Sequence, residues 1–365
     1  RIPTAITMVN GIQKMASRKG YKVNLYERCA GLLSDSPAAS TVIVVGSESS
    51  RTPHILQDLK KAQWQIVVTN VDADHIDAHY SCATFSRRII TEQMLDHLLN
   101  KGCRRIAMVG LGQRSFNDMV HQDAMAQYLL KYPYAEGACF EYQNRIDESF
   151  NAFYAMRDGF DAVLCPNAFV AVAFLHFCEE KGIVVPNDLL VACMKDHSIG
   201  RYCKPSLTSL AVDFFAIGEQ SVIVWQYLQE EGNERFRMRI AIQGHVIERE
   251  STGTALGEGA QSLANDGTLD GKYEGGPFYT DPELQALMSL ERCLQNCDEL
   301  DLRIIRLLLD GEHYDAISER LYLGDSSLQY RVRKIFHSAQ TKSRDEFIRL
   351  MRNSFTRNTH FGEEE

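Results

Sequence analysis

The stretch SSLQYRVRKIFHSA, residues 326–339, carries cations and no acid, and its residue types can bind nucleic acid. It contains Arg331, Arg333 and Lys334, whereas the whole chain of 365 residues has a formal net charge of −9. Guanidinium and ammonium groups neutralise phosphates, and arginine also donates to base edges. Two alternatives stay open for this charge pattern: a solvated helix face, or a helix that reads DNA.

A helical projection at about 100° per residue separates the two faces of this stretch. The inward, apolar positions are Leu328, Val332, Ile335 and Ala339. The outward positions are Ser326, Tyr330, Arg333, Lys334 and His337, with Gln329 and Arg331 on the flanks. The polar and basic side chains therefore lie together on the exposed face.

Two shorter helical patterns precede this stretch. Leu302, Ile305, Leu308 and Leu309 form an apolar stripe that Gly311 ends, and Ala316, Ile317 and Leu321 form a second stripe. The segment LGDSS then predicts a tight turn with Asp325 or Ser326 as the N-cap. Two short helices, a turn and a basic third helix predict a helix-turn-helix.

The distribution of charge supports DNA contact at this end of the chain. Residues 301–357 hold 11 basic and 8 acidic residues, and the rest of the chain holds 28 and 40. Because phosphate repels an acidic body, contact with DNA is expected only at the C-terminal helices.

About 55 residues that include LDLRIIRLLLDGEHYDAISERLYLGDSSLQYRVRKIFHSAQTKSRDEFI resemble the LuxR/GerE type of helix-turn-helix. The positions in register are Ile317, Leu321, Ser327, Leu328, Ile335, Ser343 and Arg344. The usual histidine of the third helix is Arg331, and Leu328 replaces the usual valine. The resemblance implies that Gln329, Tyr330 and Arg333 read bases, and that Ser327, Arg331 and Lys334 contact phosphate.

From about residue 10 to residue 200, strand-like apolar runs alternate with helical patterns. The predicted strands are KVNLYE, STVIVVGS, QIVVTNV, RIAMVG, ACFEYQ, DAVLCPN and LLVACM. This alternation predicts an α/β domain with a mainly parallel sheet, which binds ligands at the carboxyl ends of its strands.

Segments of residues 8–253 resemble, in order, the ligand-binding domain of the LacI/GalR repressors, which has a type 1 periplasmic-binding-protein fold. They include MLDHLLNKGCRRIAMVG, DAVLCPNAFVAVAFLHFCEEKGIVVPNDLLVACMKD, KPSLTSLAVDFFAIGEQSV and ERESTG. Two departures concern length, because the family's first strand would precede Arg1, and the connection between KVNLYE and STVIVVGS is short.

The resemblance also implies the residues that contact an effector, a small molecule held between two lobes. These residues are Asn70, His121, Asn167, Lys195 and Phe214. Sugar-responsive members carry Asp and Arg where this chain has Lys195 and His121, and a lysine cannot accept a hydrogen bond. The effector is therefore expected to be sugar-like or an anionic metabolite, although the same replacements would also fit a chain that has lost small-molecule sensing.

Other residue patterns give no catalytic site and no cofactor. The segment GLGQRS lacks the endings of a phosphate loop or a dinucleotide fingerprint, and no nucleophile elbow is present. The ten cysteines are scattered, which favours buried reduced thiols over a disulfide framework or a metal site. With no membrane span and no signal peptide visible, the sequence predicts a cytoplasmic protein that is not an enzyme.

The sequence therefore predicts a two-lobed α/β sensor of the periplasmic-binding-protein type with parallel sheets, followed by a small all-α helix-turn-helix domain. The expected bounds are 1–84 with 212–240 for lobe 1, 85–211 with 241–253 for lobe 2, 254–281 for a glycine-rich linker, 282–298 for a connecting helix and 299–357 for the DNA-binding domain. The function expected is a homodimeric, ligand-responsive transcriptional regulator that binds double-stranded DNA. The alternatives are a degenerate sensor that acts as a dimerisation or protein-interaction module, and an extracytoplasmic solute-binding protein.

Overall fold

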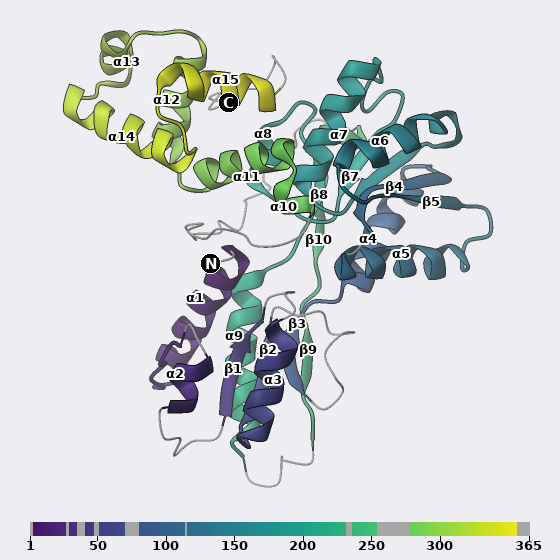
Figure 1. The fold of residues 1–365 in the computed structure, drawn as a ribbon, viewed down its shortest axis with the longest axis vertical. Helices are drawn as coiled ribbons and strands as arrows, with labels where there is room; N and C mark the ends of the chain where they lie inside the picture. Colours follow the sequence, from purple (N-terminus) through teal and green to yellow (C-terminus); the bar gives the residue numbers. More distant parts are fainter. Residues whose placement is uncertain are drawn as a thin grey trace. The chain divides into compact units, whose positions relative to one another are not determined.

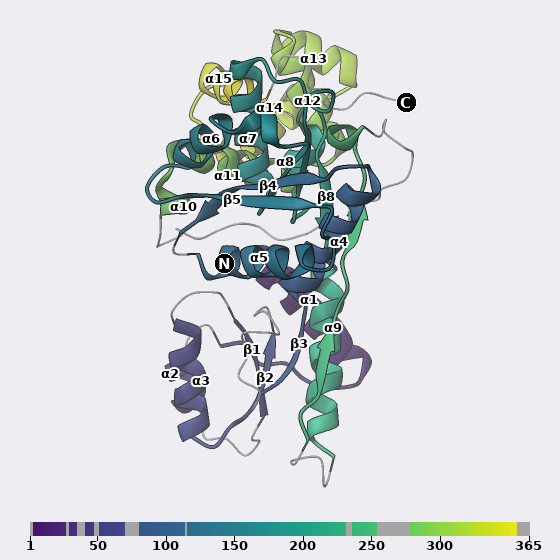
Figure 2. The same ribbon diagram turned by 90° about the vertical axis from the view of Figure 1, so that its right-hand side faces the viewer.

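A computed structural model shows an α/β fold with two parallel-stranded sheets and a helical C-terminal region (Figures 1 and 2). It describes residues 3–26, 29–34, 41–46, 51–69, 80–113, 115–230, 236–253 and 277–355. The chain forms two compact units. The first contains the described residues of 1–89 and 212–244, and the second those of 90–211, 245–253 and 277–355.

The first unit is built on a four-stranded, all-parallel sheet. Its strands, in spatial order, are β1 (Thr41–Val45), β2 (Gln65–Thr69), β3 (Ser81–Thr84) and β9 (Arg239–Ala241). The β-branched residues of β2 point alternately to the two faces, so that Ile66 and Val68 join one buried cluster and Val67 joins another. The predicted strand KVNLYE is wrong, because its described residues 22–26 pair with no strand.

Helices α1 (Pro3–Arg18) and α9 (Phe214–Leu228) pack closely in the first unit, which also contains α2 (Cys29–Ser34) and α3 (Arg51–Lys61). Two glycines make the close approach possible. A Cβ atom at Gly218 would collide with the carbonyl oxygen of Met8, and one at Gly11 would collide with that of Phe215.

The second unit contains a six-stranded sheet that is parallel except at one edge. Its order is β10 (His245–Ile247), β8 (Thr208–Ala211), β7 (Leu190–Cys193), β6 (Ala162–Cys165), β4 (Arg105–Gly112) and β5 (Glu136–Tyr142), with β10 antiparallel to β8. Figure 2 shows α4 (Arg87–Asn100) and α5 (Phe116–Leu129) on one face of this sheet. Helices α6 (Ile146–Tyr154) and α7 (Ala168–Lys181) cover the other face, and the short α8 (Ser198–Tyr202) follows β7.

The C-terminal helices belong to the second unit and not to a separate body. They are α10 (Pro277–Thr280), α11 (Pro282–Gln295), α12 (Glu299–Leu309), α13 (Tyr314–Leu321), α14 (Asp325–Ser338) and α15 (Arg344–Ser354). One continuous cluster of buried apolar residues joins them to α7 and to strands of the six-stranded sheet. The apolar stripe of α11 is buried against α7 and α8 within this cluster, and the predicted bounds of sensor, connecting helix and DNA-binding domain stay a prediction.

The structure describes only part of the predicted linker, residues 254–281. Residues 254–276 lie outside the described part of the chain. Residues 277–280 form α10, a short helix that the glycine-rich composition of the segment did not predict. Asp281 is the N-cap of α11, and its carboxylate accepts hydrogen bonds from the N–H groups of Glu283 and Leu284. Its other oxygen accepts from Ile146 N at 3.3 Å and so ties α11 to α6.

Seven of the ten cysteines are buried as predicted, whereas Cys29 and Cys297 are half-buried and Cys139 is exposed. All ten cysteines lie in the described part of the chain, and all are free thiols. Within that same part, no helix combines the length and the apolar character needed to cross a membrane.

Candidate functional site

Helices α13 and α14 are joined by a tight turn at residues 322–324. Tyr322 adopts the left-handed conformation with φ of 53°, and Leu323 N donates to Ser318 O at 2.9 Å to close α13. Gly324 is the N-cap of α14, so the predicted caps Asp325 and Ser326 are wrong. Instead the carboxylate of Asp325 accepts from the hydroxyl of Ser318 at 3.2 Å, which ties the two helices together.

The inward face of α14 is the one that the sequence predicts. Leu328, Val332, Ile335 and Ala339 are all buried. Gln329, Tyr330 and Arg333, the expected base readers, are exposed, as is Ser327 in the first turn. Tyr330 is 71% exposed, and the turn adds Tyr322, which is 96% exposed and which the sequence analysis did not indicate. The sequence could have indicated the exposure of Tyr322, because a large residue in a tight turn between two apolar stripes has no core position to occupy.

Arg331 and Lys334, two of the expected phosphate contacts, form ion pairs within the protein. The Nη1 atom of Arg331 lies 2.7 Å from Asp301 and 2.8 Å from Asp298. The Nζ atom of Lys334 lies 2.9 Å from the other oxygen of Asp301, whose side chain is fully buried. Because Asp298 and Asp301 form the capping box at the start of α12, these bonds fasten α14 to that helix end.

The ion pairs shift the pKa values of the charged groups in the directions that keep them charged. Hydrogen bonds with Asp298 and Asp301 raise the pKa of Arg331 above its ordinary value. Burial lowers the pKa of Lys334, but the hydrogen bond and charge of Asp301 outweigh burial and raise it. Within the described part of the chain, Arg333 is therefore the one cation of residues 326–339 without an ion pair.

The second unit places three of the predicted effector residues in elements near the carboxyl ends of its strands. Asn167 follows β6 and caps α7, where its Oδ1 accepts from Phe169 N at 3.0 Å and from Val170 N at 3.1 Å. Its Nδ2 atom is then the group with which it can donate to a ligand. Lys195 follows β7 and is half-buried.

His121 is a buried residue of α5 and not a surface histidine. Its Nδ1 lies 2.7 Å from Oγ1 of Thr91, whose hydroxyl also lies 3.4 Å from the sulfur of Met194. Met194 precedes Lys195 in the chain, so a chain of direct contacts connects His121 to the residue next to Lys195. The sequence did not indicate Thr91 or Met194, because their proximity depends on the ends of α4 and β7.

The segment after β7 is held rigidly. Asp196 accepts from Nη1 of Arg249 at 2.8 Å and from Ser209 Oγ at 2.6 Å, and both charged side chains are largely buried. The imidazole of His197 lies 4.5 Å from the ring of Phe169, centroid to centroid. Burial and the nearby charge of Lys195 lower the pKa of His197 to about 3, so its ring is neutral near pH 7.

In the first unit, Phe214 lies in an aromatic and cationic cluster. Its ring meets Phe85 edge to face at 5.7 Å, and the guanidinium of Arg87 lies 5.0 Å from the Phe85 ring. Phe85 follows β3 directly, so the cluster sits at the carboxyl end of that strand. Asn70, the fifth predicted effector residue, lies outside the described residues.

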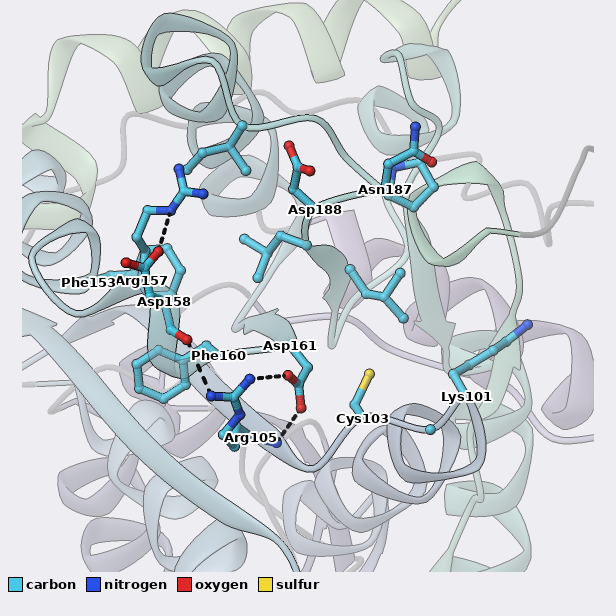
Figure 3. A pocket seen from close by; sticks show the side chains of 15 residues that line it. Lys101, Cys103, Arg105, Phe153, Arg157, Asp158, Phe160, Asp161, Asn187 and Asp188 are labelled. Atoms are coloured by element: carbon cyan, nitrogen blue, oxygen red, sulfur yellow. Dashed lines mark hydrogen bonds and ion pairs between the residues drawn. The ribbon is translucent and has the colours of Figure 1, made fainter.

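A cavity of about 560 Å³ in the second unit lies at the opposite edge of the sheet, at the amino ends of β4, β6 and β7 (Figure 3). None of the predicted effector residues lines it. Its three cations are already paired: Arg105 with Asp161 at 2.8 Å, Arg157 with Asp158 at 3.3 Å, and Lys101 with Glu248 at 2.8 Å. Among the described residues, no group of His, Cys, Asp and Glu is arranged to hold a metal ion.

Comparison with known proteins shows what the α/β part of the chain is similar to. Residues 95–252 match the periplasmic binding protein-like domain family. The chain is 25% identical over 217 residues to the HTH-type transcriptional regulator GntR of Escherichia coli K12, and the match covers 56% of this chain and 62% of that protein. The chain thus spans less than two thirds of the length of this relative.

Solved structures share the fold of the α/β units. A transcription regulator from Lactobacillus plantarum superposes with a TM-score of 0.56 at 19% identity, over 68% of this chain and 96% of that one. A LacI family transcriptional regulator from Weissella paramesenteroides with bound sucrose gives a TM-score of 0.53 at 17% identity, over 69% and 94%. The two-lobed periplasmic-binding-protein-like fold that the sequence predicts is confirmed.

Proposed function

We propose that the chain is a cytoplasmic, ligand-responsive transcriptional regulator in which α13 and α14 form a helix-turn-helix of the LuxR type that binds double-stranded DNA. The observation that carries the proposal is the exposed face of α14. It displays Gln329, Tyr330 and Arg333 on a helix whose apolar side is buried. Amide and guanidinium groups are the side-chain groups that make paired hydrogen bonds to base edges in the major groove.

The proposed division of roles on α14 is narrower than the sequence implies. Arg333 is the reader with a free guanidinium, and Gln329, Tyr330 and Ser327 complete the surface. The pairing with Asp301 makes Arg331 and Lys334 mainly supports of the helix. The regulator is expected to act as a homodimer, because two copies of a short recognition helix can read two half-sites.

Selection of DNA duplexes from a random library, followed by fluorescence anisotropy at two salt concentrations, tests the proposal. Arg333→Ala should weaken binding to the tightest-binding selected duplex by about 1–3 kcal/mol and relax the preference at one base pair. Arg333→Lys is the matched control for charge. It should keep the salt dependence but lose the base preference, because a lysine cannot donate in the paired geometry of a guanidinium. Equal affinity of all three proteins for every duplex would contradict the proposal.

We propose an anionic metabolite as the effector, bound at the carboxyl ends of the strands. In the second unit, the cation at this edge is Lys195, which follows β7. The neutral His197 and the amide of Asn167 add uncharged polar groups in the second unit. The sucrose in the Weissella protein makes a sugar the second candidate.

A protein-interaction module is the rival function, and one observation favours it. Tyr322 and Tyr330 are highly exposed, and exposed tyrosines are common in protein interfaces. The DNA selection separates the two functions. A chain that binds no duplex at low salt, where phosphate contacts are strongest, would have the interaction role instead.

A further inference from the structure

Glu291 is a buried carboxylate through which α11 binds the backbone at the start of α8. Its side chain is 1% exposed. One oxygen accepts from Ser198 N at 3.0 Å and the other from Ile199 N at 2.7 Å. These are the first two N–H groups of α8, which have no acceptor within their own helix. Burial raises the pKa of Glu291, while the N–H groups of Ile199 and Ser198 act in the opposite direction.

The N–H groups that Glu291 binds belong to the segment after β7. This segment also carries the proposed effector residue Lys195. Lys195 lies three residues before Ser198, on the segment fixed by the Asp196–Arg249 pair. His197, the N-cap of α8, rests on Phe169, and the N–H of Phe169 is capped by Asn167. A change at Lys195 or Asn167 on ligand binding is therefore expected to reach His197, the N-cap of α8, through two residues of chain or through the contact with Phe169.

The opposite face of α11 contacts the proposed reading helix. Cys293 lies two residues after Glu291, which on an α-helix is a rotation of about 200°. Its thiol faces Ile335 O of α14 at 3.5 Å. One turn earlier, Ser289 Oγ lies 3.4 Å from Oε1 of Gln340, just beyond the end of α14. A single helix thus contacts the segment after β7 on one side and α14 on the other.

We propose that Glu291 is a positioning residue that couples the effector-binding segment 194–198 to the orientation of α14. The inference rests on the proposed function for its biological meaning, since it names the route by which an effector would change DNA affinity. The two backbone hydrogen bonds move α11 together with the N-terminus of α8, and the buried contact of Cys293 carries α14 with it. Without Glu291, α11 keeps its apolar packing but loses its directional link to the segment.

Two variants weaken the link from its two sides, and in both the N–H of Ile199 remains as a donor. Glu291→Gln keeps one acceptor oxygen and places an amide N–H₂ against a backbone N–H. Ser198→Pro removes the N–H of residue 198, which donates to Glu291. Proline is tolerated at the first position of a helix when the preceding residue is extended, and His197 is extended, with φ −120° and ψ 154°. Glu283→Gln is the matched control, because Glu283 lies on the same helix and contacts His176 of α7 but not the segment.

Hydrogen exchange read by mass spectrometry tests the coupling without any ligand. His197→Ala perturbs the segment by removing the ring that rests on Phe169. It should speed exchange of peptides within 282–295 and 325–338 at least about fivefold in the background with Glu291 and in Glu283→Gln. In the Glu291→Gln or Ser198→Pro background the added effect should fall below about twofold. An effect of the same size in all backgrounds, or none in any, would overturn the proposal.

A second arm adds the tightest selected duplex to the same proteins. Because coupling is reciprocal, duplex binding should slow exchange of residues 194–199 in the chain with Glu291 and not in Glu291→Gln. A bound duplex that leaves residues 194–199 unchanged would count against the coupling. If the first arm succeeds and no duplex binds, the coupling stands and the DNA-binding function fails, so the two proposals are separated.

Discussion

Arg331 of α14 donates to the buried carboxylate of Asp301 on α12 across 2.7 Å, and the same guanidinium reaches Asp298. A cation that sequence similarity places at the DNA therefore forms part of the packing between two helices. The difference matters because a residue that neutralises a buried charge affects stability first and DNA affinity second.

Arg331→Ala is expected to lower the free energy of unfolding by about 2 kcal/mol, since it leaves Asp301 with Lys334 as its remaining cation. Urea unfolding followed by circular dichroism measures the change. Arg333→Ala is the control on the same helix and should stay within about 0.5 kcal/mol of the wild type, because Arg333 is exposed and unpaired. Two variants of equal stability would place Arg331 at the surface.

The pair also predicts a dependence of stability on pH. Although burial raises the pKa of Asp298, its hydrogen bonds with Arg331 and Asp301 lower it more, so the pKa in the folded state lies below the ordinary value of 3.8. The folded state then binds fewer protons than the unfolded state. This contribution is present above the unfolded pKa and is lost as the pH falls through the folded pKa.

Unfolding free energies measured from pH 6 down to about pH 2 should therefore converge for the wild type and Arg331→Ala as Asp298 becomes protonated. A difference between them that stays constant over this range would exclude the charge of Asp298 as its source.

Gly218 gives a prediction for the first unit. Gly218→Ala should destabilise the unit by about 1–3 kcal/mol, because the new methyl group collides with the backbone of α1 at Met8. Gly31→Ala is the control. Gly31 also lies in a helix, and an added Cβ there has its nearest neighbour at 3.7 Å, so alanine's better helix propensity should leave stability unchanged or raise it. Thermal unfolding of both variants measures the contrast.

The sequence predicted the parts of the structure that follow from local periodicity. The inward residues Leu328, Val332 and Ile335 are buried because a 3.6-residue period fixes one face of a helix wherever the helix lies. The strands QIVVTNV and DAVLCPN are β2 and β6 because their β-branched and apolar runs suit a sheet covered on both faces.

The sequence did not predict features that depend on contacts between distant segments. The partners of Arg331 lie 33 and 30 residues earlier, and no local pattern connects them. The same holds for Thr91 beside His121 and for Glu291 beside Ser198, where the partner is fixed by how whole helices pack. KVNLYE has the composition of a strand, but a strand also needs a neighbour with which to pair.

Lys195→Asp gives the test of the effector site. A library of carboxylates, phosphates and neutral sugars, screened by thermal shift, should contain anions that stabilise the wild type, because a ligand that binds only the folded state raises the melting temperature. Lys195→Asp should abolish stabilisation by those anions, since it replaces an ammonium with a carboxylate at the end of β7 and introduces repulsion. Lys101→Asp is the matched control, because Lys101 lines the cavity at the opposite edge of the same sheet. Loss of the shift in Lys101→Asp alone would move the ligand to the cavity of Figure 3, and stabilisation by sugars alone would replace the anion with a neutral effector.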